Sequence, residues 1–231
     1  MASIGTTSFY IRVPSLPAKE FQEYSTNVFD EWESYVAGTL QIPDYSLVLD
    51  VEEGSIKGVA KVGAVLGAVY LGIGQYGSFI SGLQTIDSQI RTAGDYLSRA
   101  SEAPFKRQGV KAKVQKRGES LARLQTLFVK VQKGEMSIEQ AMKETEEIFG
   151  SEIDDAPGFM DELKAALRKM PQQIDLPFEL EELKNLSSIP QIKSSRKPRK
   201  PRDPAPQREH YRIEVWRESR GSKKNVKLVQ F

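Results

Sequence analysis

The chain has 231 residues, of which 39% are hydrophobic and 28% are charged, an ordinary composition for one large globular domain or two small ones. Cysteine is absent, which excludes disulfides, thiolate metal sites and a cysteine nucleophile, and suits a reducing compartment. The first residues lack a basic segment followed by a long apolar stretch, so we expect no secretory signal and a cytoplasmic protein.

The net charge of +2 conceals a strong segregation of charge along the chain. Residues 1–105 carry 6 basic and 12 acidic side chains, residues 106–133 carry 9 and 1, and residues 135–162 carry 1 and 10. The tail, residues 193–231, carries 13 basic and 4 acidic side chains. We expect the two middle segments to neutralise each other, as antiparallel helices or between two chains, which leaves the charge of the tail available to a partner.

The predicted elements begin with a strand, because apolar and polar residues alternate from Phe9 to Val13. A helix follows, with an apolar face between residues 21 and 35. Two aliphatic, β-branched runs at residues 47–51 and 56–62 are separated by a turn at Gly54, which predicts a hairpin.

The next segment, residues 62–86, is uncharged and rich in glycine, and we interpret it as one helix. A face of small side chains would let another backbone approach closely, in a buried core, at an oligomer interface or in a membrane. The length meets the membrane rule of about 20 residues, but several polar side chains make the hydrophobicity marginal. On a helical wheel the small residues on one side are Gly63, Gly67, Gly74, Gly77, Ser78 and Ser81.

Gly72, Gly74 and Gly77 also have the G-x-G-x-x-G spacing of dinucleotide-binding turns. That chemistry requires a buried strand over residues 65–71, a helix opening at Ser78, and then a second parallel strand. A polar, basic and helical segment follows instead, so a dinucleotide-dependent enzyme is only a third alternative.

Helices dominate the middle of the predicted fold. Charges alternate in sign at four-residue spacing from Asp87 to Arg99, which favours a helix. Ser137 and Gln140 have the spacing of a capping box that opens another helix. Further amphipathic helices are predicted near residues 121–131, 159–170 and 178–186.

The C-terminal part changes in composition. Residues 187–209 are rich in proline, serine and basic side chains, as in a linker, and residues 210–231 read as a hairpin that pairs with the N-terminal sheet or with another chain. Basic side chains with an interleaved aromatic ring suit phosphates, either of nucleic acid or of an anionic membrane. The candidate polyanion-binding residues are Lys197, Arg199, Lys200, Arg202, Arg212, Trp216, Lys223 and Lys224.

No signature of a phosphate-binding loop, zinc protease, hydrolase or calcium loop is present, and His210 is the single histidine, so we expect no catalytic residue, cofactor or metal. The predicted fold is α+β, with a small mixed sheet, a long glycine-rich helix, a helical layer and a C-terminal hairpin. The predicted divisions are residues 1–105, 106–186, 187–209 and 210–231.

The leading functional hypothesis is a non-enzymatic, self-associating interaction or effector protein that binds a protein partner or itself, with marginal membrane association left open. The alternative is a nucleic-acid-binding adaptor that uses the tail and a helix over residues 106–133.

Overall fold

The computed structural model describes residues 2–156, 158–170 and 210–230. Its strands are β1 (Ala2–Ile11), β2 (Ser46–Glu52), β3 (Ile56–Ala64), β4 (Lys113–Arg117), β5 (Tyr211–Arg217) and β6 (Asn225–Gln230). Its α-helices are α1 (Ala18–Thr39), α2 (Leu66–Ile73), α3 (Phe79–Glu102), α4 (Glu119–Gln132), α5 (Ile138–Phe149) and α6 (Phe159–Lys169). Short 3₁₀ helices are η1 (Gly74–Tyr76), η2 (Ala103–Gln108) and η3 (Gly150–Ile153). The predicted α+β class is confirmed.

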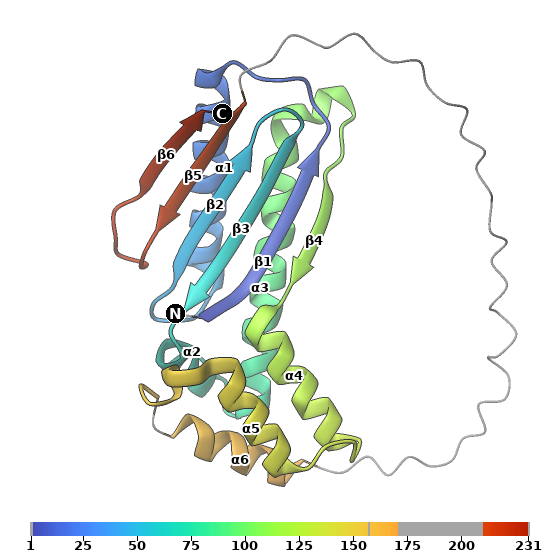
Figure 1. Ribbon diagram of the computed structural model, residues 1–231, viewed down its shortest axis with the longest axis vertical. Helices are drawn as coiled ribbons and strands as arrows, with labels where there is room; N and C mark the ends of the chain where they lie inside the picture. The colour runs from blue at the N-terminus through green and yellow to red at the C-terminus, as the bar shows by residue number, and fades with distance from the viewer. Residues whose placement is uncertain (1, 157, 171–209, 231) are drawn as a thin grey trace, which may run out of the picture.

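The strands form one antiparallel sheet in the order β4-β1-β3-β2-β5-β6 (Figure 1). The first four strands and the two long helices α1 and α3 follow one another as in the ferredoxin-like βαββαβ arrangement. The hairpin of β5 and β6 extends this unit at the outer edge of β2, where Val215 pairs with Leu49. The C-terminal hairpin therefore joins the N-terminal sheet, one of the two pairings that the sequence left open.

One face of the sheet carries the main core. Figure 1 shows α1 and α3 behind the strands, and the core-side residues of β2 and β5, such as Leu49 and Val215, are fully buried there. From α1, Phe29 and Trp32 enter the same core. Burial of each such side chain contributes about 1.5–3 kcal/mol, so this layer fixes the sheet against the helices.

The remaining helices lie beyond one end of the sheet (Figure 1). They enclose an aromatic cluster in which Phe159 contacts Phe79 and Phe149, with ring centroids 5.4 and 5.6 Å apart. The capping box of α5 is confirmed, since Gln140 N–H donates to the Ser137 hydroxyl and Ser137 N–H donates to the Gln140 side chain. These helices share one continuous apolar core with the sheet.

The interpretation of residues 62–86 as one helix is wrong. Gly63 belongs to β3, Gly67 to α2 and Gly74 to η1, while Gly77 has a φ of 75° that ends the helical path. Strand β3 continues to Ala64 because it pairs with β1 on one side and β2 on the other. The predicted small-residue face therefore does not exist as one surface.

The two serines of that face have a local role instead. Ser78 is the N-cap of α3, and its hydroxyl accepts a hydrogen bond from the Ser81 N–H at 3.2 Å. This bond satisfies one of the free N–H groups at the start of the helix.

Two other glycines make the close approaches. A Cβ at Gly82 would lie 2.8 Å from Ile73 Cα and closer still to its carbonyl oxygen, and one at Gly72 would lie 3.0 Å from the Gln41 carbonyl oxygen. The backbone that fits against small residues is thus the chain's own: α3 folds back on α2 at Gly82, and the segment between α1 and β2 approaches α2 at Gly72.

Two further interpretations are wrong because a segment forms a helix where they need a strand, or a strand where they need a helix. Residues 66–73 form α2, so the strand that a dinucleotide-binding turn needs before Gly72 is a helix. Residues 106–133 are not one helix, because Lys113–Arg117 alternate and pair with β1 as strand β4. Among the described helices, none is both long enough and apolar enough to cross a membrane.

Candidate nucleic-acid interface

Several of the predicted polyanion-binding residues hold the hairpin in place. Arg212 on β5 forms a bidentate ion pair with the Asp50 carboxylate on β2. Its hydrogen bonding to Asp50 raises the pKa of the guanidinium. Lys224 donates to both oxygens of Asp30 on α1, at 2.6 and 2.8 Å. Lys223 is exposed in the turn before β6. The predicted residues Lys197, Arg199, Lys200 and Arg202 lie outside the described part of the chain.

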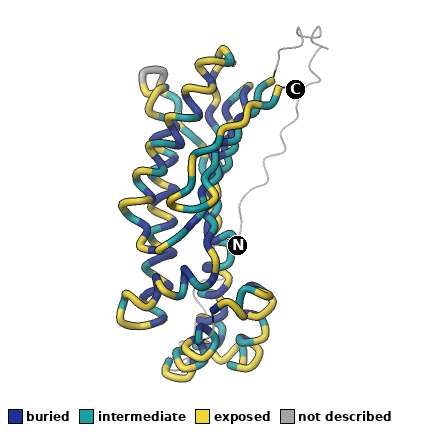
Figure 2. Tube along the Cα trace, turned by 90° about the vertical axis from the view of Figure 1, so that its left-hand side faces the viewer, coloured by how far each residue is buried: buried dark blue, intermediate teal, exposed yellow. Residues whose placement is uncertain are grey.

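The sheet has an uncovered face opposite α1 and α3. No described element lies in front of the strands in Figure 1, and the view at right angles in Figure 2 shows the long helices on one side of the sheet, with the other helices beyond its end. Alternation along β1 assigns the side chains, since Thr7, Phe9 and Ile11 are buried while Ser8 and Tyr10 are half-buried. The predicted residue Trp216 also lies on this open face, beside Val48 of β2.

Strand register brings four cations together on the open face. Tyr10 of β1 pairs with Lys57 of β3 on one side and with Lys113 of β4 on the other. Four residues along, Thr6 pairs in the same way with two further cations, one on each side. We call this set the basic patch; its members are Lys57, Lys61, Lys113 and Arg117.

The basic patch has a defined size. Its two columns are separated by β1, hence by two strand spacings, or roughly 10 Å, and its two rows by four residues, or roughly 13 Å. Tyr10 and Thr6 are the side chains between the columns at the two ends, and Ser8 lies between them. The arrangement is a phenol ring and two hydroxyls framed by four positive charges.

These cations are weakly neutralised. The Lys57 ammonium lies 4.0 Å from the Glu52 carboxylate, with both side chains at least half exposed, a geometry that contributes little in water. Lys116, which points to the other face of β4, is instead bonded to Asp95 of α3 at 2.5 Å. Lys113 and Arg117, the two cations of β4 on the open face, are therefore distinct from Lys116, which binds β4 to α3.

Over β2 and β5, the open face carries mainly acidic side chains. Asp50, Glu52 and Glu214 lie over β2 and β5, with Arg212 among them. The acidic and basic residues here pair with one another, as in the contact of Arg212 with Glu214 at 3.2 Å. The basic patch thus lies over β4, β1 and β3, and Val48 of β2 lies between Lys61 and Trp216.

Sequence reasoning placed Lys113 and Arg117 in a basic helix over residues 106–133 and assigned no role to Lys57 and Lys61. Lys57 and Lys61 flank Val59 at every second position of β3, and the cations of β4 show the same period, which is the signal of a strand with one polar face. The convergence itself is not visible in the sequence, because it depends on β1 lying between β3 and β4.

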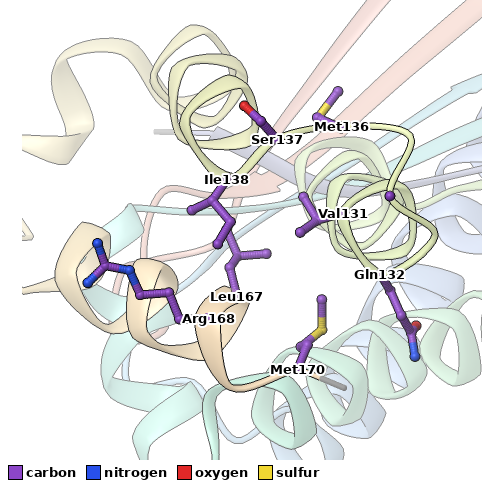
Figure 3. A pocket seen from close by; sticks show the side chains of 9 residues that line it. Val131, Gln132, Met136, Ser137, Ile138, Leu167, Arg168 and Met170 are labelled. Carbon is purple, nitrogen blue, oxygen red and sulfur yellow. The ribbon is translucent and has the colours of Figure 1, made fainter. Parts of the chain in front are cut away.

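A cavity of about 510 Å³ opens between α4, α5 and α6. In Figure 3, Ile138 and Leu167 point toward one another across it, and Arg168 points away from its centre. Gln132, Ser137 and Arg168 line it together with apolar side chains, and these residues offer no pair of a nucleophile and a base. Within the described residues, no group of three or more histidine, aspartate or glutamate side chains is placed to hold a metal ion.

Comparisons with known proteins give no relative from which a role could be transferred. The sequence matches no protein-family model and no curated protein, and the fold matches no solved structure. The open face and its charges are therefore the basis for a functional interpretation.

Proposed function

We propose that this protein binds single-stranded nucleic acid across the open face of β4, β1 and β3. The observation that carries the proposal is the convergence of the basic patch around Tyr10 on an uncovered sheet face. Cations along a groove or face track phosphates, and an exposed ring stacks on a base. Trp216 offers a second ring two strands away from Lys61.

A comparison with the RNA-recognition sheet motif supports this proposal and also limits it. That motif reads K/R-G-F/Y-G/A-F-V-x-F/Y on a strand whose rings stack on bases. Strand β3 has Lys57, Gly58, Ala60 and Val62 in the matching positions. Aliphatic residues or lysine stand where the motif has rings, so the interaction proposed here is led by charge and has little sequence preference.

Gly58 shows why small residues suit this strand. A Cβ at this position would overlap the ring of Phe9, which lies across Gly58 on the core side of the sheet. The glycine leaves room for the Phe9 ring, and the alternation along β1 places the neighbouring Tyr10 on the opposite, open face.

The charge-led proposal has a quantitative signature. Four phosphate contacts on a single strand predict that the logarithm of affinity falls with the logarithm of salt concentration with a slope of about −3. A protein that reads bases by hydrogen bonds would show a shallower slope and a strong dependence on sequence.

Fluorescence anisotropy with labelled 12-nucleotide RNA and DNA tests the proposal. The double variant Lys61→Glu with Arg117→Glu is expected to lose about tenfold or more in affinity and to flatten the salt slope. The matched control is Lys19→Glu, which reverses an exposed charge on α1, behind the sheet, and should bind as the natural chain does. Absence of binding at low salt, or equal binding by both variants, would refute the proposal.

A further inference from the structure

We propose that two copies of this chain pair through β6, antiparallel and about a two-fold axis, to form one continuous sheet. Strand β6 is the last in the described sheet order, and its outer backbone edge has no neighbouring strand there. Such an edge presents a row of N–H and C=O groups that another strand can join. The proposal does not depend on nucleic-acid binding.

The two edges of the sheet differ in how they are protected. Edge strand β4 is five residues long and carries three cations, which is the usual protection against pairing with another sheet. Edge strand β6 is six residues long and carries the single cation Lys227. On the helix side of β6, Val226 and Leu228 remain 40% and 43% exposed.

The apolar side chains of β6 lie next to a buried strand. Leu228 pairs with Ile213 of β5 and Val226 with Val215, and both of these β5 residues are fully buried. The apolar layer between the sheet and α1 thus reaches β6 and stops there uncovered. A second sheet joined at this edge would extend that layer and cover the two exposed side chains.

The sequence of β6 is self-complementary in one antiparallel register. With Leu228 on the two-fold axis, Lys227 stands opposite Val229 of the second copy and Val226 stands opposite Gln230. No like charges face each other in this register, and the two leucines meet at the centre. The closed two-fold arrangement uses one surface only, as an isologous dimer requires.

Pairing through β6 would fix how the open faces of the two copies lie relative to each other. Adjacent antiparallel strands are related by axes perpendicular to the sheet, so both open faces would lie on the same side and α1 and α3 of both copies on the other. Seven strand spacings separate the two β3 strands in this arrangement, or roughly 33 Å. Self-association, first expected from the glycine-rich segment, is assigned here to a different surface.

Sedimentation velocity of the full chain, from about 1 to 100 µM, tests the proposal. The natural chain is expected to approach twice its mass of 25.9 kDa as concentration rises. Leu228→Lys puts two like charges at the axis and should remain a monomer. The matched control is Val129→Lys, because Val129 is 47% exposed and lies on α4, away from β6. This variant should still form the dimer.

The outcomes divide cleanly. A natural chain that stays monomeric throughout, a Leu228→Lys variant that still dimerises, or a Val129→Lys variant that dissociates overturns the proposal. Where near-ultraviolet circular dichroism shows that Leu228→Lys has lost its fold, hydrogen exchange of the natural chain decides. Protection of β6 amides that increases with protein concentration supports pairing, and concentration-independent exchange overturns it.

Discussion

Lys224 and Asp30 are 194 positions apart in the sequence, yet the Lys224 ammonium lies 2.6 Å from one Asp30 carboxylate oxygen. The pair connects the turn of the C-terminal hairpin to the middle of α1. Arg217 makes a second contact of this kind with Glu33, one helical turn further along. The hairpin is thus fastened to the helix layer as well as to the edge of β2.

Asp30→Asn is expected to destabilise the fold only slightly. The Asp30 side chain is 48% exposed, and ion pairs of this kind typically contribute about 0.2–1 kcal/mol, less at high salt. Urea unfolding at low and high salt measures the difference between the variant and the natural chain. A loss of several kcal/mol that persists in 1 M salt would contradict this assignment.

Gly82→Ala is expected to cost about 1–3 kcal/mol, because the new methyl group would meet the backbone of Ile73 and force α2 and α3 apart. Gly74→Ala is the matched control, since a Cβ there meets nothing within 4 Å and the residue has helical backbone angles. That control should be neutral or stabilise by about 0.4–1 kcal/mol. Thermal unfolding of both variants checks the pair, and equal melting temperatures would argue against the close approach.

Tyr24 predicts a dependence of stability on alkaline pH. Its hydroxyl donates to the Ser101 carbonyl oxygen at 3.1 Å, and burial raises the pKa above the ordinary 10.0. In the unfolded chain the phenol ionises near pH 10, so its contribution to folding is complete below that pH and is lost as pH rises beyond it.

The variant Tyr24→Phe isolates this contribution. At pH 8 it should be less stable by about 1 kcal/mol, because the hydrogen bond is lost. Between pH 10 and 11 its deficit should shrink toward zero, since only the natural chain is weakened by ionisation of the unfolded state. Denaturant unfolding across this range measures the difference, and a constant deficit would contradict burial of the hydroxyl.

Tyr10 separates stacking from charge at the proposed interface. Tyr10→Ala is expected to weaken binding of single-stranded RNA by about 1–3 kcal/mol, with the salt slope unchanged because no cation is removed. Tyr10→Phe retains the ring and should bind nearly as the natural chain does. Anisotropy titrations at two salt concentrations measure both effects, and equal losses in both variants would argue that the ring does not stack.

Local sequence patterns predicted much of the fold. The turn at Gly54 between β2 and β3 and the capping box at Ser137 each depend on neighbours within a few residues, and each formed as expected. The strand predicted over Phe9 to Val13 also formed, but β1 begins at Ala2 and ends at Ile11. The charge ladder from Asp87 to Arg99 likewise gave α3. Where the interactions that form an element join residues close together in the chain, the sequence was sufficient to predict that element.

The failures occurred where distant contacts decide. Val62 and Gly63 fit either a helix or a strand, and pairing of β3 on both edges selects the strand. Strand β4 has Val114 as its one apolar residue, so its basic residues were read as helix. The grouping of Lys61 with Arg117 was missed because only the sheet order brings their strands to the two sides of β1, whereas Trp216 had been predicted from its basic neighbours alone.

Because the chain is synthesised from its N-terminus, β5 is made long after β2, the strand that it pairs with. Strand β2 lies inside the finished sheet, yet the strand that covers its outer edge is made about 150 residues after β3 is complete. At 5–20 residues per second, that edge waits on the order of ten to thirty seconds. During this interval Leu47, Leu49 and Val51 belong to an edge strand, so newly made chains are most exposed to mispairing and to chaperones before residues 211–217 emerge as β5.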